Sequence, residues 1–170
     1  MAAKKKTIRT IPQERTPMRE QDPKERARNF SEVACGYLVE DALREADRCL
    51  QCADEPCVRG CPVGIDIPGF IAAVSQRNIK EAFRILKDSN GLPAVCGRVC
   101  THKCETDCTR GEVEAPIAIA GLKRFVTDYA FANVPLPEKV PVTFKEKVAI
   151  VGAGPSGLTA ARDLALLGYE

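Results

Sequence analysis

Nine cysteines stand in this 170-residue chain, and eight of them fall into two closely spaced groups. The first group lies in CLQCADEPCVRGC, residues 49–61, and is followed directly by Pro62. The second group places cysteines at 96, 100, 104 and 108. Thiolates at such short intervals are typical of metal ligands, because several of them can converge on one soft metal centre. We therefore expect a fold organised around metal centres.

The spacing of the first group favours iron–sulfur clusters over zinc. A structural zinc site usually takes two CxxC pairs, or one CxxC with a His pair, set apart by a dozen or more residues. This chain has one CxxC and a single histidine, His102. The pattern CxxCx4CxxxCP instead matches bacterial ferredoxins, in which the last cysteine commonly serves a different cluster. Purely structural cysteines would not recur regularly beside charged residues, so a zinc site is the main alternative.

Two [4Fe–4S] clusters account for all eight grouped cysteines, because each cluster takes four ligands. We assign each cluster one ligand from the other group, which ties distant segments together and couples folding to cluster insertion. The predicted ligands of the first cluster are Cys49, Cys52, Cys57 and Cys108. The predicted ligands of the second cluster are Cys61, Cys96, Cys100 and Cys104. The spacing alone does not decide which cluster binds Cys61 and which binds Cys108. Cys35, outside both groups, is interpreted as a small hydrophobic side chain.

Composition excludes several other classes of protein. The N-terminus MAAKKKTIRT has a basic opening with no apolar segment behind it, which argues against a signal peptide. We therefore expect a cytoplasmic protein with reduced thiols. No apolar run approaches the roughly 18 residues of a membrane span. The net charge of +2 is too small to indicate nucleic acid as a partner.

Apolar residues at helical spacing predict that residues 38–133 are all helical, within a domain that we place at residues 31–133. One helix is expected over 38–50, and Asp66 and Asn78 are predicted N-caps of two more. Pro116 is expected to open a fourth helix.

The segments on either side of this domain have a different composition. Residues 1–30 carry nine Lys or Arg against four Asp or Glu and few large apolar side chains. Such a segment cannot easily bury a face, so we expect a basic, extended or disordered arm. Residues 134–146, VPLPEKVPVTFKE, contain three prolines and are predicted to be a semi-rigid linker.

The last segment contains the GxGxxG motif, with Gly152, Gly154 and Gly157 in KVAIVGAGPSGL. An apolar run before the glycines and helix formers after them predict a buried strand, a tight turn and a helix. This is the start of a Rossmann-type unit, whose helix N-terminus faces a pyrophosphate. The acidic residue that binds the ribose would lie about 20 residues further on. We therefore expect residues 147–170 to be the truncated start of an FAD-binding domain in the front portion of a longer flavoprotein. Alone, this segment is expected either to be poorly ordered or to pack against a partner.

Four segments, in their order and spacing, resemble one known family: CLQCADEPCVRGCPVGIDIPGFI, LPAVCGRVC, PIAIAGLKRFVTD and KVAIVGAGPSGL. The family is that of the glutamate synthase small (beta) subunit. It includes the N-terminal region of dihydropyrimidine dehydrogenase and the large subunit of NADH-dependent ferredoxin:NADP oxidoreductase. The resemblance implies that residues 31–133 are an α-helical ferredoxin-like domain with two [4Fe–4S] clusters. It also implies that an FAD domain, which receives electrons from NAD(P)H, follows this domain. A partner subunit, similar to the glutamate synthase large subunit or another electron acceptor, would exchange electrons with the clusters.

One position departs from this family in a way that bears on the second cluster. Its members commonly carry Glu or Gln where Lys123 stands, and in some of them that oxygen binds a cluster. An ammonium group has no lone pair to donate to iron. Cys104 also follows Cys100 at a shorter interval than in those relatives. We therefore predict that Cys96, which is not a ligand in those relatives, completes the second cluster.

The resemblance implies an NAD(P)H-dependent iron–sulfur flavoprotein oxidoreductase when the protein is full length. These 170 residues alone are not expected to be catalytically complete. A zinc-stapled docking module without redox activity is the alternative function. A self-sufficient ferredoxin is disfavoured, because a free ferredoxin has no need of the glycine motif.

Overall fold

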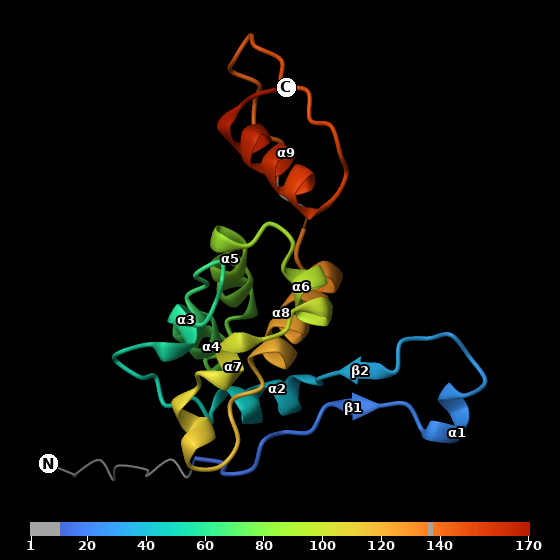
Figure 1. Ribbon diagram of the computed structural model, residues 1–170, viewed down its shortest axis with the longest axis vertical. Coiled ribbons are helices and arrows are strands. Elements are labelled where there is room, and N and C mark those ends of the chain that lie inside the picture. The colour runs from blue at the N-terminus through green and yellow to red at the C-terminus, as the bar shows by residue number, and fades with distance from the viewer. Residues whose placement is uncertain (1–10, 136–137) are drawn as a thin grey trace, which may run out of the picture.

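Helices dominate the computed structural model of the chain, which describes residues 11–135 and 138–170 (Figure 1). α8 packs against α5 and α6, and α4 packs against α5 and α2. The predicted mainly α fold is confirmed, and the described residues add a single two-stranded sheet. The longer helices of the body are α2 (Val39–Ala46), α4 (Ile67–Ser75), α5 (Ile79–Ser89), α6 (Pro93–Val99) and α8 (Ile119–Asn133).

Both predicted N-caps are confirmed. The Asp66 carboxylate accepts a hydrogen bond of 2.8 Å from the backbone N–H of Gly69 at the start of α4. The Asn78 side chain accepts one of 3.2 Å from the N–H of Glu81 at the start of α5. Each side chain satisfies an N–H group that has no partner inside the helix, which fixes where the helix begins.

The prediction that Pro116 opens a helix is wrong, because α8 begins at Ile119. Side chains from elsewhere in the chain form hydrogen bonds with the backbone before α8. The carbonyl of Pro116 accepts a hydrogen bond from Arg48, and the N–H of Ala118 donates one of 2.8 Å to Glu45. These contacts hold the segment in an extended path, so a helix can start only after it.

The core lies where α4, α5 and α8 meet. α4 is buried along most of its length, whereas α5 buries only its apolar face. Each large apolar side chain removed from water stabilises the fold by roughly 1.5–3 kcal/mol. Side chains that are less than 2% exposed include Phe70, Ile71, Val74, Leu86, Leu122 and Val126.

Three short elements beside this core either contain a cysteine or directly follow one. They are α3 (Pro56–Arg59), α7 (Lys103–Thr106) and the 3-10 helix η1 (Thr109–Glu112). α3 packs against both α7 and α4. The two cysteine groups are therefore adjacent in space although they are separate in the sequence.

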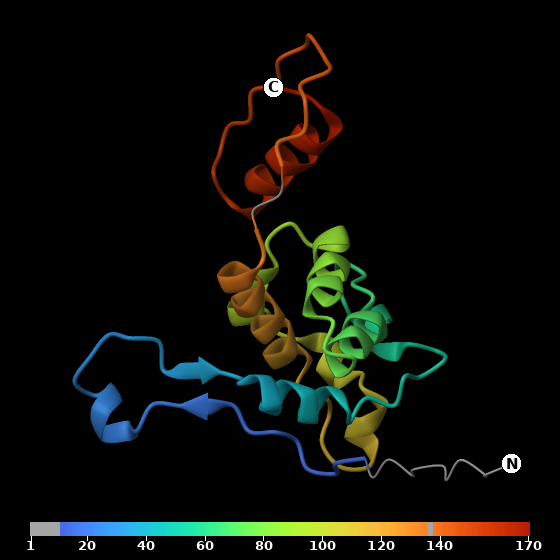
Figure 2. The same cartoon turned by 180° about the vertical axis from the view of Figure 1, so that it is seen from behind.

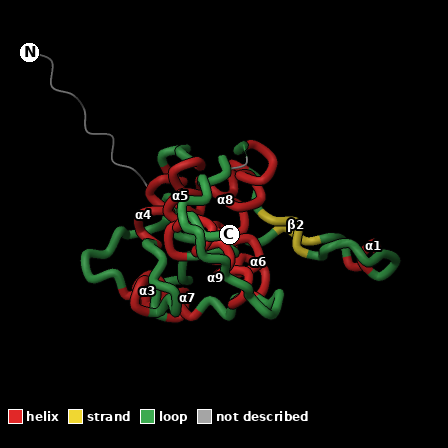
Figure 3. Tube along the Cα trace, turned by 90° about the horizontal axis from the view of Figure 1, so that it is seen from above, coloured by secondary structure: helices red, strands yellow, loops and turns green. Residues whose placement is uncertain are grey.

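The N-terminal part of the chain forms a hairpin that extends away from the helices (Figures 1, 2 and 3). Strand β1 (Arg19–Glu20) pairs antiparallel with β2 (Ala34–Gly36), and α1 (Pro23–Arg26) lies between them. Of the predicted basic arm, residues 1–10 lie outside the described residues. Residues 11–18 are extended as expected, yet they pack on the helical body, and Thr16 is only 4% exposed.

The C-terminal part forms α9 (Pro155–Leu167) above the body in Figure 1. The predicted helix is present, but residues 147–153 form no strand, so that prediction is wrong for this structure. A strand of a parallel sheet depends on hydrogen bonds from neighbouring strands, and no described strand lies beside this segment. The side chain of Val151 is fully exposed as a result. Residues 138–146 of the predicted linker are exposed and irregular, and residues 136–137 lie outside the described residues.

Within residues 11–135 and 138–170, no helix has the length and apolar character that crossing a membrane requires.

Candidate metal centres

The four cysteines predicted for the first cluster line one pocket. Cys49 follows the end of α2 and Cys52 lies in the next loop, whereas Cys57 stands on α3 and Cys108 immediately precedes η1. The remaining wall is largely apolar and includes Ile67, Ile71, Ile117 and Ile119. The fold thus brings together thiols that are as many as 59 positions apart in the sequence, from Cys49 to Cys108.

The surroundings of these thiols favour their neutral form. Burial raises the pKa of Cys49, and burial together with the neighbouring Cys49 and Cys108 raises the pKa of Cys57 to about 11. A low-dielectric pocket disfavours thiolates, especially several of them together. A bound cationic centre reverses this preference, because thiolates bind metals in the deprotonated form. Four thiols in an apolar pocket therefore fit an iron–sulfur cluster, whose positive irons would offset the thiolate charges.

Three of the four cysteines predicted for the second cluster also lie near one another. Cys104, on α7, is buried, and its pKa is raised to about 12, mainly by burial and then by Cys61. Cys100, at the end of α6, raises it further. The Cys100 sulfur also accepts a hydrogen bond of 3.3 Å from the backbone N–H of His102. Cys61 and Cys100 therefore lie close enough to Cys104 for their charges to affect its pKa.

The structure places Cys96 differently from these three thiols. Its sulfur lies 3.9 Å from the amide oxygen of Asn90, in the turn between α5 and α6. Its role as the fourth ligand therefore stays a prediction. Lys123, on α8, is buried, and its positive charge lowers the pKa of Cys104. The position that departs from the family pattern is thus next to the second group of thiols.

Cys35 lies outside both groups, as expected, but it does not pack in the core as a small hydrophobic side chain would. It is exposed on the hairpin strand β2. Across the part of the chain that the structure describes, no group of three or more His, Cys, Asp or Glu side chains could hold a metal ion as the side chains stand.

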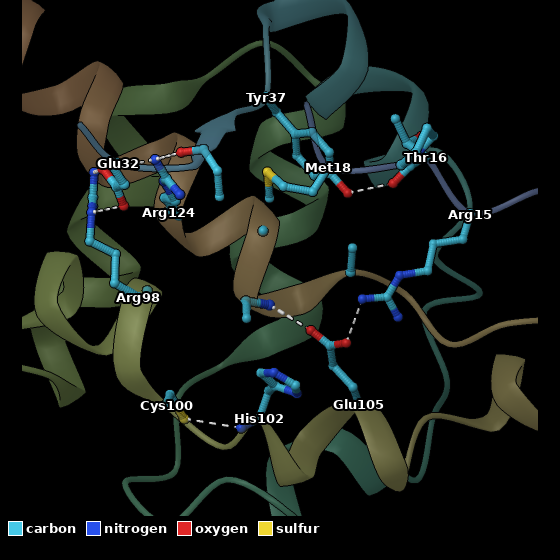
Figure 4. A pocket seen from close by; sticks show the side chains of 16 residues that line it. Arg15, Thr16, Met18, Glu32, Tyr37, Arg98, Cys100, His102, Glu105 and Arg124 are labelled. Atoms are coloured by element: carbon cyan, nitrogen blue, oxygen red, sulfur yellow. Dashed lines mark hydrogen bonds and ion pairs between the residues drawn. The ribbon is translucent and has the colours of Figure 1, made fainter. Parts of the chain in front are cut away.

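A pocket of about 430 Å³ adjoins Cys100 and was not foreseen from the sequence (Figure 4). It lies between the N-terminal segment and helices α6 and α8. Arg15 forms an ion pair of 2.7 Å with Glu105, and Arg98 forms one of 3.0 Å with Glu32. Each pair joins residues more than sixty positions apart, so the local sequence contains no signal for it. Because these guanidinium groups are paired, their charge is largely neutralised.

The glycine motif adopts a tight turn before α9. Gly152 has φ of 113°, a left-handed conformation that favours glycine. A Cβ added to Gly157 would lie 2.1 Å from the carbonyl oxygen of Gly152, so no other residue fits there. Gly154 is the N-cap of α9 and has open space around it. The tight turn and the helix predicted for this segment are therefore formed, although the predicted strand is not.

Comparison with known proteins identifies the family. The family described as dihydropyrimidine dehydrogenase domain II, 4Fe–4S cluster, matches residues 26–134. The chain belongs to this 4Fe–4S family. The match spans both cysteine groups and the whole helical body, and it confirms the resemblance found in the sequence. The zinc alternative is not favoured, because the family is one of iron–sulfur domains.

The relatives of this 4Fe–4S protein are oxidoreductase subunits. The NAD-dependent dihydropyrimidine dehydrogenase subunit PreT of Salmonella typhimurium is 42% identical over 143 residues, covering 83% of this chain and 35% of the relative. The glutamate synthase (NADPH) small chain of Halomonas elongata is 41% identical over 149 residues, covering 83% and 32%. The NADPH-Fe(3+) oxidoreductase subunit beta of Geobacter sulfurreducens is 47% identical over 115 residues, covering 67% and 17%. The chain thus spans about a third or less of each of these relatives.

Proposed function

We propose that this chain carries electrons between an NAD(P)H-reduced FAD domain and a partner redox subunit, through two [4Fe–4S] clusters. The observation that carries the proposal is the single apolar pocket lined by four cysteines from both groups. When bound, such a cluster gains or loses one electron at a time. The apolar wall would limit access of water to it.

In this proposal the cysteines divide as the sequence predicts. The first cluster would be bound by Cys49, Cys52, Cys57 and Cys108. The second cluster would be bound by Cys61, Cys100, Cys104 and Cys96. The effects of Cys61 and Cys100 on the pKa of Cys104 support the assignment of these three thiols to one cluster. The assignment of Cys96 depends on the sequence argument alone.

The flavin and the nucleotide belong to the larger protein that this proposal implies. The turn at Gly152, Gly154 and Gly157 supports binding of FAD, because its backbone leaves room for a pyrophosphate at the start of α9. The names of the relatives, which specify NAD or NADPH, support NAD(P)H as the electron donor. They also support a partner subunit, since each relative is one chain of a larger oxidoreductase.

Iron and sulfide analysis tests the proposal. Anaerobically purified protein is expected to be brown and to contain about eight iron atoms and eight acid-labile sulfides per chain. Cys57→Ser is expected to lose about half of both, because the first cluster loses a ligand. Cys35→Ser, at an exposed cysteine outside both groups, is the matched control and is expected to retain all of them. Colourless protein with bound zinc and no acid-labile sulfide would contradict the proposal.

The same assay tests the fourth ligand of the second cluster. Cys96→Ser is expected to lose iron and sulfide as Cys57→Ser does. Retention of two complete clusters would show that Cys96 is not a ligand, without affecting the case for the other seven cysteines.

A further inference from the structure

Lys123 is a buried cation where α8 meets two cysteine-bearing helices, α6 and α7. It is 7% exposed and lies on α8, one turn after Ala120. The N–H of Ala120 donates a hydrogen bond of 2.9 Å to Glu105, the residue that follows Cys104 on α7. A Cβ added to Gly97 on α6 would lie 3.1 Å from the Cα of Arg124, so α6 and α8 are in close contact here. Lys123 is therefore held where α6, α7 and α8 meet.

The other strongly buried cations of the body have carboxylate partners. Arg48 pairs with Glu45 at 2.7 Å, and both side chains are completely buried. Arg110 pairs with Glu114 at 2.7 Å. Arg124, the neighbour of Lys123, pairs with two carboxylates, those of Glu32 and Asp128.

Lys123 differs from these arginines in having no such partner. Among residues 11–135 and 138–170, no hydrogen bond or ion pair joins its ammonium group to a carboxylate. The Lys123 Nζ is not among the fully buried, unsatisfied polar atoms of the described residues, so the charged end of this largely buried side chain borders an open space. Buried charges in proteins are normally paired or bound to another charged group. The Lys123 ammonium group is thus available to pair with an anionic group that the protein binds.

The thiols next to Lys123 supply that anionic group once they bind a cluster. Lys123, Glu105, Cys61 and Cys100 all lie close enough to Cys104 for their charges to act on it, and Lys123 is the positive one among them. Glu105 is already paired with Arg15. Four thiolates on a [4Fe–4S] core leave a net negative charge, and reduction by one electron adds one more without breaking a bond. A fixed positive charge in a poorly solvated site stabilises that added charge.

We propose that Lys123 is a fixed counter-charge for the second cluster, which makes this cluster easier to reduce than it would be without the lysine. The inference rests on the proposed function, because it requires a cluster at Cys61, Cys100 and Cys104. The first cysteine pocket contains a different arrangement: its one cationic side chain, Arg110, is already paired with Glu114. The two sites therefore differ in uncompensated charge, and this difference sets which cluster holds the electron.

Redox titration of the purified protein, followed by visible and electron paramagnetic resonance spectra, tests this assignment. Lys123→Met removes the charge and keeps the length of the side chain. It is expected to move one of the two cluster potentials to a more negative value and to leave the other in place. Lys123→Arg keeps the charge and is expected to titrate as the unmodified protein does. Lys80→Met, at an exposed lysine on α5, is the matched control and is expected to change neither potential.

Iron and sulfide contents of the same samples make each outcome decisive. If Lys123→Met loses one cluster while Lys123→Arg keeps both, the counter-charge is supported, because cluster binding then depends on the charge. If Lys123→Met keeps both clusters and both potentials, the inference is overturned. It is also overturned if Lys123→Arg behaves as Lys123→Met does. Absence of acid-labile sulfide from the unmodified protein would instead contradict the proposed function.

Discussion

At the scale of single residues, buried polar groups link parts of the chain that are distant in sequence. The carboxylate of Glu45 is completely buried and accepts hydrogen bonds from the N–H of Thr16, at 2.7 Å, and from Ala118. It also pairs with Arg48. Such a carboxylate is tolerated only because every bond to it is made, so each contact fixes the position of a separate segment. Tyr37 extends the same network by donating a hydrogen bond of 2.7 Å to the carbonyl of Thr16.

Replacing Tyr37 with Phe tests this network and predicts a pH dependence. Loss of the hydrogen bond is expected to lower the free energy of unfolding by about 1 kcal/mol at neutral pH. Burial, and next the charge of Glu45, raise the pKa of Tyr37 above its ordinary value of about 10. A raised pKa means that the phenol stabilises the fold fully below pH 10 and progressively less above it.

The difference between the original protein and Tyr37→Phe is therefore expected to shrink as the pH rises from 8 to 11. Denaturant unfolding at a series of pH values measures it. Tyr129→Phe, at an exposed tyrosine on α8, is the control and is expected to show no such trend. A constant difference across this range would contradict the prediction.

At the scale of elements, the caps do not contribute equally to stability. Asn78 caps α5, which buries Ile79, Ala82 and Leu86 in the core. Asp22 caps α1 with a bond of 2.8 Å to the N–H of Lys24, but α1 has no buried residue and lies on the protruding hairpin. A cap stabilises the whole protein only where its helix unfolds together with the core.

Asn78→Ala is accordingly expected to lower the global free energy of unfolding by about 1 kcal/mol. Asp22→Ala removes the same kind of cap and is expected to change it by much less, because α1 can unravel while the body stays folded. Thermal or denaturant unfolding compares the two variants. Equal losses would mean that the hairpin and the helices unfold as one unit.

At the scale of the whole molecule, the N-terminal segment closes the helical body. Arg15 pairs with Glu105 on α7, and Thr16 is bound to Glu45 on α2. The carbonyl of Gln13 accepts a hydrogen bond from the buried Arg48. The segment therefore connects the element that carries Cys104 to the helix that leads to Cys49.

Deletion of residues 1–18 is expected to lower the free energy of unfolding by at least about 3 kcal/mol, because it leaves Glu45 and Arg48 without some of their partners. Deletion of residues 1–10 alone keeps all of these contacts and serves as the control. Thermal unfolding of both shortened proteins measures the effect. Equal melting temperatures would show that the segment does not contribute to the stability of the body.

The parts of the fold that were predictable depend on neighbours in the sequence. Asp66 and Asn78 cap their helices through bonds to residues three positions away, and the apolar face of α5 follows from its own periodicity. The cysteine groups were recognisable because ligand spacing is also a local property. The family that these patterns indicated was confirmed.

The parts that were not predictable depend on distant partners. The hairpin, the path before Ile119 and the pocket at Arg98 and Glu32 each arise from contacts between segments that the local sequence does not connect. The strand expected before the glycine motif is absent for the same reason, because a buried strand exists only beside other strands.

By itself the sequence determined that this chain is mainly helical, that eight of its cysteines fall into two closely spaced groups, and that a glycine turn follows them. These properties are local, since helix periodicity, cap spacing and ligand spacing act over a few residues. Only the tertiary structure decided which thiols share a pocket, and that a buried lysine without a carboxylate stands next to Cys104. Packing settles these matters, because burial and the balance of charge depend on all the segments that meet at a point.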